Sequence, residues 1–301
     1  MALSSARATA FDGRDSTPKS RRNRSLAWAK FRRNRLAAGS AVLLLVLALM
    51  AVLAPWVATR DPLRIDLRHK FAAPGTPGFV LGADELGRDL FSRLLHAGRV
   101  SLAVGLLTAL IAVTVGSILG ALAGYYSGTL DAVIMRIADT LLSTPTIFVL
   151  LALSAFLKPR FSTIILIIGL NSWMSVARLV RGQILSIKQQ EFILAARALG
   201  AGDRRLIFRQ LLPNSLAPVL VAATLNVATA ILTESSLSYL GYGIQPPTAT
   251  WGNMLNNAQA YVRVAPWVAV YPGAMITLTV LSFNFAGDGV RDALDPRLTA
   301  S

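Results

Sequence analysis

RGQILSIKQQEFILAARALGAGDRRLIFRQLLPN, the stretch from Arg181 to Asn214, is a polar interval between two segments apolar enough to cross a bilayer. Four of its residues recur at three- and four-residue spacing and so share one helical face: Phe192, Ala195, Ala196 and Leu199. This helix is far shorter than the ~20 apolar residues that a membrane span needs. We therefore expect it to lie outside the bilayer and to offer small residues to a neighbour.

A turn and a second helix are predicted to follow. Gly200 and Gly202 predict a left-handed stop. Asp203 can cap the second helix, and Pro213 is expected to end it. From the pattern alone, an amphipathic helix that rests on the lipid surface is an equally good interpretation of the interval.

Composition excludes an ordinary soluble chain. Of the 301 residues, 54% are hydrophobic and only 15% are charged, and the net charge is +15. Ten basic residues precede the first apolar segment and seven more lie between 178 and 209, whereas 57–98 has six basic and five acidic residues. This distribution is the positive-inside pattern, so a nucleic acid partner is not needed to explain the charge.

Six apolar segments predict an all-α, polytopic bundle of six transmembrane helices: 37–58, 100–126, 132–157, 162–180, 216–239 and 265–285. The chain then divides into a cytoplasmic basic tail with an interfacial helix, the first span with an extracytoplasmic loop, a permease core that contains 181–214, and a cytoplasmic C-terminal tail: 1–35, 36–98, 99–286 and 287–301. Six spans place both termini and 181–214 on the positive side. A transit peptide is the competing interpretation of 1–25.

Small and polar residues within the spans suggest packing and a pathway. Gly116, Gly120 and Gly124 repeat every four residues, which predicts close helix approach inside the bundle. Asp131, Arg136 and Asp139 predict an ion pair within one helix.

Three further polar residues are candidates for a transport pathway: Asn171, Asn226 and Glu234. An ionised carboxylate is costly at membrane depth, so Glu234 marks either a hydrated pathway or the outer interface, and the glycines that follow it favour the interface. The chain has no cysteine and two isolated histidines, so no metal site is expected.

Ala195-Ala196, Gly200, and Leu212-Pro213 ending thirteen positions past that glycine resemble the cytoplasmic coupling loop of permease subunits in ABC importers. The resemblance implies that contact with an ATPase involves the following residues: Glu191, Ala195, Ala196, Gly200, Asp203, Leu212 and Pro213. Leu194 departs from the family pattern, which often has Glu at this position.

Further motifs extend the resemblance over Leu26 to Arg297. Gly82 to Asp89 has glycines at P-loop spacing but lacks the Lys and Ser/Thr that hold phosphate and Mg²⁺. It is instead similar to the segment ahead of the second span in dipeptide and oligopeptide permeases. Other stretches resemble the C-type permease subunit of dipeptide, oligopeptide and nickel ABC importers: 233–241, 245–247, 251–252 and 288–297.

This resemblance implies a bacterial inner-membrane subunit with the fold of a type I importer permease. It implies pairing with a homologous B-type permease, docking of two ATPase subunits that hold ATP and Mg²⁺, and substrate delivery by an extracytoplasmic binding protein. No cofactor or enzymatic activity is expected in this chain. Peptides are the expected cargo, with nickel chelates or glutathione as alternatives within the family. A secondary transporter driven by an ion gradient and a non-transporting scaffold are the interpretations from other classes.

Overall fold

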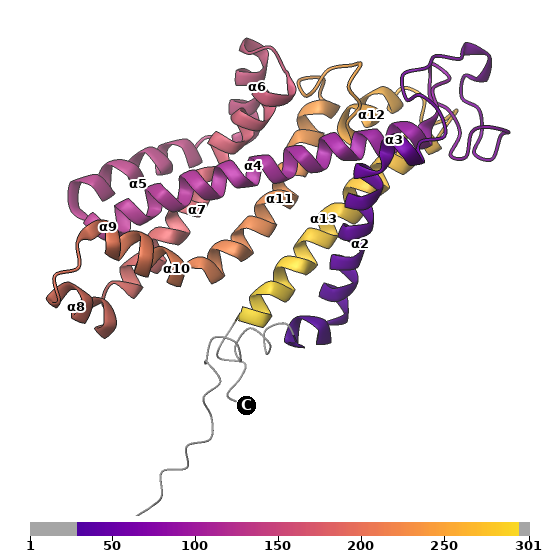
Figure 1. The fold of residues 1–301 in the computed structure, drawn as a ribbon. Coiled ribbons are helices and arrows are strands. Elements are labelled where there is room, and N and C mark those ends of the chain that lie inside the picture. Colours follow the sequence, from indigo (N-terminus) through magenta and orange to yellow (C-terminus); the bar gives the residue numbers. More distant parts are fainter. Residues whose placement is uncertain (1–28, 295–301) are drawn as a thin grey trace, which may run out of the picture.

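The computed structural model describes residues 29–294, and within this range the chain is helical apart from its connecting loops and two isolated β-bridges (Figure 1). The predicted tail over 1–25 and the last seven residues of the predicted C-terminal tail, 287–301, lie outside the described residues. The elements are α2 (Arg35–Val52), α3 (Ala54–Val57), the 3₁₀ helix η1 (Leu67–His69), α4 (Leu90–Tyr126), α5 (Gly128–Leu142), α6 (Thr146–Phe156), α7 (Phe161–Ile187), α8 (Glu191–Ala198), α9 (Asp203–Arg205), the π-helix η2 (Leu206–Leu211), α10 (Leu212–Asn214), α11 (Leu216–Tyr239), α12 (Trp251–Ala258) and α13 (Trp267–Leu294).

Five of the described helices are long and apolar enough to cross a membrane: α2, α4, α7, α11 and α13. A sixth crossing is made if α5 and α6 count as one span. This span is broken, because the two helices meet at an angle of 87°. The segment 132–157, expected as one span, is therefore divided between two helices by a sharp bend at 143–145. Pro145 precedes α6, where its missing N–H and fixed φ favour a helix start rather than a continuing helix.

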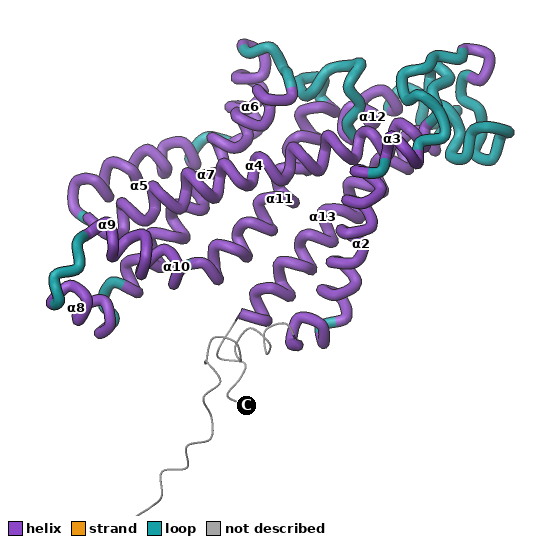
Figure 2. The backbone as a smooth tube through the Cα atoms, viewed as in Figure 1, coloured by secondary structure: helices purple, strands orange, loops and turns teal. Residues whose placement is uncertain are grey.

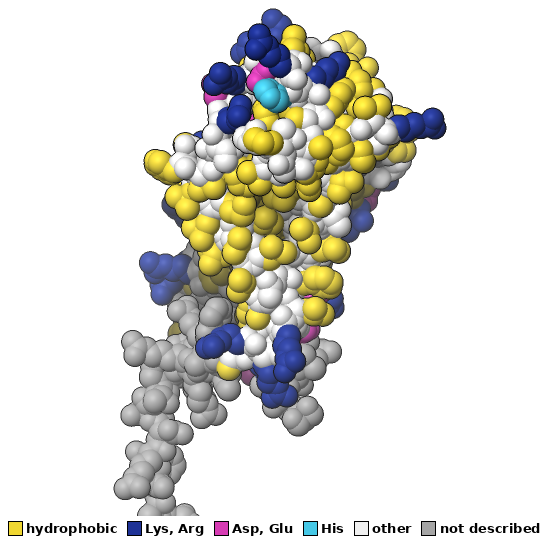
Figure 3. Space-filling view, turned by 90° about the vertical axis from the view of Figure 1, so that its right-hand side faces the viewer, with side chains coloured by type: hydrophobic (Ala, Val, Ile, Leu, Met, Phe, Trp, Pro, Cys, Tyr) yellow, Lys and Arg dark blue, Asp and Glu magenta, His cyan; other side chains and the backbone are white. Residues whose placement is uncertain are grey.

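The molecule has two polar ends separated by an apolar belt. Figure 1 shows α8 and α9 at one end and the loop between α3 and α4 at the other, and Figure 2 shows how much non-helical chain gathers at that second end. In the face drawn in Figure 3, hydrophobic side chains cover the middle while Lys and Arg side chains cluster at both ends. This is the surface of a membrane protein whose ends project from the bilayer.

Several helices extend past their predicted bounds. α4 begins at Leu90 rather than at 100, α7 continues to Ile187 rather than 180, and α13 continues to Leu294 rather than 285. At 1.5 Å per residue, the 37 residues of α4 span about 55 Å, well beyond a hydrocarbon core of about 30 Å. Hydropathy identifies the part of a helix in lipid, and the helix itself continues on either side.

The packing of α4 on α7 depends on glycine. A Cβ at Gly116 would lie 2.6 Å from Val176 Cβ, and one at Gly120 would collide with the backbone of Ala177. A Cβ at Gly124 would lie 2.9 Å from Ile184 Cβ, in the last turns of α7. Small residues let helix backbones approach in a bilayer, where apolar burial alone gives little driving force between helices.

α5 is attached to α7 by ion pairs. Asp131 accepts two hydrogen bonds from Arg181, at 2.5 and 2.6 Å, and Asp139 accepts one from Arg178 at 2.6 Å. The predicted pairing of both acids with Arg136 within one helix is therefore wrong. An arginine on the facing helix reaches the carboxylate with its planar fork, which local spacing in the sequence does not reveal.

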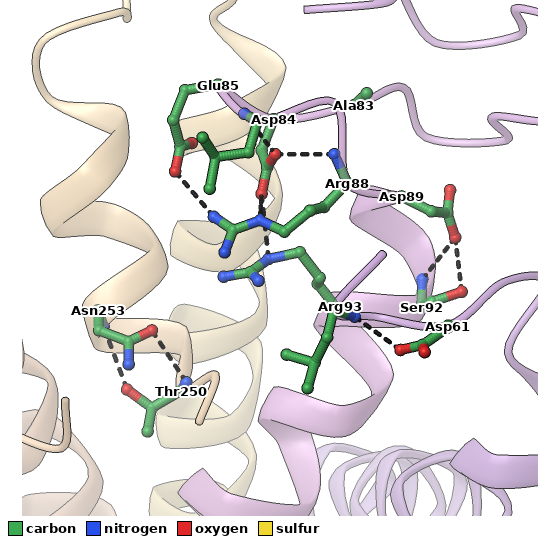
Figure 4. Close-up of polar contacts among 12 residues, drawn as sticks. Asp61, Ala83, Asp84, Glu85, Arg88, Asp89, Ser92, Arg93, Thr250 and Asn253 are labelled. Atoms are coloured by element: carbon green, nitrogen blue, oxygen red, sulfur yellow. Dashed lines mark hydrogen bonds and ion pairs between the residues drawn. The ribbon is translucent and has the colours of Figure 1, made fainter. Parts of the chain in front are cut away.

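A carboxylate organises the turn before α4. Asp84 is buried, and its Oδ1 accepts from the Arg88 backbone N–H while its Oδ2 accepts from Arg88 Nε at 2.7 Å and lies 3.2 Å from Arg93 Nε (Figure 4). Asp89 caps α4, because its Oδ2 accepts from the Ser92 backbone N–H at 2.9 Å. The glycine-rich stretch thus closes around a side-chain carboxylate, and its arginines are neutralised internally.

α12 covers the N-terminal end of α4. Thr250 and Asn253 form a reciprocal capping box at its first turn. The buried Trp251 then donates from its indole N–H to the carbonyl of Leu94 in α4, 3.1 Å away. This hydrogen bond fixes the loop between α11 and α13 against the bundle.

We expect Gly120→Ala to reduce stability, because the new methyl group would force α4 and α7 apart. Overpacking of this kind costs about 1–3 kcal/mol. Gly182→Ala is the matched control, since Gly182 lies in α7 with nothing within 4 Å of its missing Cβ. That control should be neutral or stabilising by up to about 1 kcal/mol. Denaturant titrations in detergent micelles measure both, and equal midpoints for the two variants would contradict the role given to Gly120.

Candidate functional site

α8 stands outside the spans as a short helix with apolar side chains in solvent. Phe192 is 44% exposed, Leu194 52% and Leu199 89%. Gly200 has φ +81°, the left-handed conformation expected of a helix stop, whereas Gly202 is extended at φ −70°. The glycine turn therefore uses the first of its two glycines for the reversal.

One side of α8 is anchored in the bundle. Ile193 is 1% exposed and packs in a cluster with Leu206 and Leu211 of the following π-helix, against which Ala196 is half buried. Ala195 is exposed. The predicted small-residue face is thus divided, with Ala196 turned toward the bundle and Ala195 toward solvent.

The second helix of the interval runs from Asp203 to Asn214 through α9, η2 and α10. Asp203 does not cap it, because the N-cap residue is Gly202 and no side-chain cap is present. Asp203 instead accepts a 2.5 Å hydrogen bond from the hydroxyl of Tyr125, a residue of α4. Pro213 lies inside the last turn of α10, one residue before it ends.

Besides Asp203, two polar side chains tie this interval to the C-terminal end of α4. Lys188 donates from Nζ to the Gly124 carbonyl at 2.9 Å and to Ser127 Oγ at 2.7 Å. Arg197 donates to the Tyr125 hydroxyl at 3.3 Å. The sequence did not single out Tyr125. Its one signal there is the adjacent pair Tyr125-Tyr126 at the C-terminal end of a predicted span.

A cavity opens between α6, α7 and α11, and its mainly apolar wall carries several amide and hydroxyl groups. Its volume is about 410 Å³, and it is lined by Leu142, Thr146, Leu150, Ile168, Asn171, Ser172, Ser175, Val176, Leu179, Ala222, Leu225, Asn226, Thr229 and Thr233. Asn171 and Asn226 therefore face one space from two different helices. The lining has amide and hydroxyl groups but no charged side chain, so it can exchange neutral hydrogen bonds with a ligand.

Glu234 lies apart from this cavity. Its side chain is completely buried in α11, where Oε1 accepts a 2.6 Å hydrogen bond from Ser238 Oγ. Ser238 is one helical turn later in the same helix and packs against Gly252 of α12. The structure thus brings together two of the three candidate pathway residues and places the third near α12.

Within residues 29–294 no three His, Asp or Glu side chains gather in a way that could hold a metal ion.

Comparison with known proteins places these features in a family. Residues 116–300 match the binding-protein-dependent transport system inner membrane component, and residues 24–74 match the N-terminal TM domain of oligopeptide transport permease C. The chain is 40% identical to the di/tripeptide permease DppC of Pseudomonas aeruginosa over 90% of this chain and 91% of that protein. It is 42% identical to the glutathione permease GsiD of Escherichia coli over 90% and 89% of the two chains.

The fold also matches that of a solved transporter. A chain from an inward-facing structure of the MetNI methionine ABC transporter superposes with a TM-score of 0.57 at 21% identity, covering 67% of this chain and 96% of that chain. The bundle, the projecting α8 and the relatives agree, and the chain belongs to the family of inner-membrane components of binding-protein-dependent ABC transport systems.

Proposed function

We propose that this chain is the C-type permease of an ATP-driven peptide importer, forming half of the translocation pathway beside a homologous B-type permease. Two cytoplasmic ATPase subunits would dock on the pair, and an extracytoplasmic binding protein would deliver the cargo. The observation that carries the proposal is α8, whose exposed apolar side chains project from a buried anchor between two membrane spans. A solvated loop gains nothing from such a surface, whereas a docking helix requires it.

Coupling follows from the position of α8. Closure of the ATPases on ATP would shift α8 as a rigid lever, and the spans that leave its two ends, α7 and α11, would tilt with it. Those two helices carry Asn171 and Asn226, so their movement changes the shape of the cavity. The residues assigned to the ATPase contact remain Glu191, Ala195, Ala196, Gly200, Asp203, Leu212 and Pro213, with Gly116, Gly120 and Gly124 holding α7 to α4 during the movement.

The uncharged cavity favours peptides as cargo. A peptide main chain presents amide donors and acceptors whatever its sequence, and burying them without partners is costly. Asn171, Asn226 and the hydroxyls around them can provide such partners without selecting for side-chain charge. Relatives named for di/tripeptides and dipeptides support the same cargo. Glutathione is the second candidate, on the strength of the GsiD relatives.

The loop between α3 and α4 and the helix α12 would lie outside the cell, with α8 and both termini in the cytoplasm. The support for this orientation is the excess of basic residues between 178 and 209, against the near balance over 57–98.

The first experiment is purification of the tagged chain in mild detergent, followed by ATP hydrolysis assays with and without the binding protein. We expect a co-purified ATPase that is stimulated by the binding protein loaded with a dipeptide or tripeptide. Stimulation only by glutathione or by a nickel chelate would replace the peptide assignment. Purification without an ATPase, under conditions that preserve a known importer complex, would favour a gradient-driven transporter.

We expect Ala195→Trp to uncouple transport without unfolding the bundle, because Ala195 is exposed on α8 where a partner groove would accept only a small side chain. Uptake should fall by about tenfold or more, the result of losing about 1.4 kcal/mol of docking energy. Thr129→Trp, at an exposed position of α5, is the control for a bulky surface residue. Uptake at the parental rate by a fully assembled Ala195→Trp complex would contradict the docking role.

The orientation can be measured because the native chain has no cysteine. We expect Ala73→Cys, in the loop before α4, to react in intact spheroplasts with a maleimide that cannot cross membranes. Gln189→Cys, just before α8, should react only after permeabilisation. Both positions are exposed, so access to the reagent depends on the membrane alone. The reverse pattern would overturn the assigned topology.

A further inference from the structure

Tyr125 joins α4 to both sides of the glycine turn that ends α8. Its hydroxyl donates to Asp203 Oδ1 at 2.5 Å and accepts from Arg197 Nη2 at 3.3 Å. Arg197 belongs to α8 and Asp203 to α9, so one hydroxyl bridges the two arms of the turn at Gly200. The Arg197 guanidinium also lies over the Tyr125 ring, 5.6 Å from its centroid.

This bridge is specific in its chemistry. The hydroxyl uses its donor toward a carboxylate and its acceptor toward a guanidinium, so both hydrogen bonds are charge-assisted. In the described part of the chain, no other hydroxyl is hydrogen-bonded to both an acidic and a basic side chain that lie more than 70 residues away in the sequence. The ring itself is held by apolar contacts in the cluster that contains Ile184, Ile193 and Leu206.

α4 is well placed to carry a movement onward. Its inner end receives the Tyr125 bridge and the Lys188 hydrogen bonds, and its glycine face is locked against α7. Its outer end is fixed to α12 by the Trp251 indole and begins at the Asp89 cap. A single helix therefore connects the surroundings of α8 with the opposite face of the molecule.

We propose that Tyr125 is a positioning residue that transmits the displacement of α8 to α4, so that ATP hydrolysis is linked to opening of the outer face. This inference rests on the proposed function. The lever then acts on a third span besides α7 and α11, one that is distant in sequence. The linkage needs the hydroxyl, whereas attachment of the ring needs only its apolar surface.

The test uses the assembled complex in proteoliposomes and measures peptide transported per ATP hydrolysed. Tyr125→Phe removes the hydroxyl and keeps the ring, and we expect the ratio to fall by about tenfold, the effect of losing a charge-assisted hydrogen bond. Tyr126→Phe is the matched control, because Tyr126 is half exposed, touches the Tyr125 ring, and has no hydrogen bond from its hydroxyl to residues 29–294. It should keep the parental ratio.

A second variant tests whether the Tyr125 hydroxyl acts through Asp203. Asp203→Ala should lower the same ratio, and the double variant should be no worse than the more severe single variant, because both changes break one linkage. A parental ratio for Tyr125→Phe would overturn the inference, as would a reduced ratio that is explained by a lower thermal midpoint of the complex. If the parental complex itself hydrolyses no ATP with loaded binding protein, the proposed function fails instead, and the inference fails with it.

Discussion

The close backbone contact between α4 and α7 is the constraint on which the rest of the molecule depends. Gly116, Gly120 and Gly124 leave no room for a side chain between these two helices. In lipid the surrounding hydrocarbon is as apolar as the helix surface, so shape rather than apolar burial keeps the helices together. With α7 fixed to α4, the chain that follows α7 must begin near the C-terminal end of α4, and this is where α8 lies.

The two ends of α4 are held by different kinds of polar contact. At the N-terminal end, Asp84 pairs with both arginines of the turn, and those groups are nearly inaccessible to water. At the C-terminal end, Tyr125 and Lys188 each make two hydrogen bonds that are only partly buried. Breaking a buried charge cluster leaves uncompensated charge, whereas partly exposed hydrogen bonds exchange more readily with water. The N-terminal end of α4 is therefore the more firmly fixed of the two.

Local patterns in the sequence predicted the apolar parts of this fold well. The span over 216–239 has the bounds of α11, and the helix and left-handed glycine over 191–200 are present as α8 and Gly200. Hydropathy failed where helices leave the lipid, as at the start of α4, because a polar helical turn there costs nothing. Hydropathy also could not distinguish a kinked helix from the 87° bend between α5 and α6, since proline kinks and proline helix starts have the same local signature.

Side-chain partners were the least predictable feature. Helical spacing paired Arg136 with Asp131, yet the bundle brings Arg181 to that carboxylate from 50 residues away. Asp203 has the residue type of a helix cap, but a tyrosine 78 residues earlier takes its carboxylate. Both of these observed pairings form only after the helices have packed. At the site, the sequence therefore predicted α8 and the two asparagines of the cavity. The contacts of Tyr125 and Lys188 and the burial of Glu234 became evident only from the packing of the helices.

The cavity between α7 and α11 is also a poor resting place for an inorganic ion. Its lining offers dipoles from Asn171, Asn226 and several hydroxyls, but no opposite charge to replace the water that a sodium ion or proton would lose. A bare ion in such surroundings carries a large unfavourable self-energy, whereas a neutral stretch of amides does not. This space therefore accommodates an uncharged polar group more readily than a bare ion.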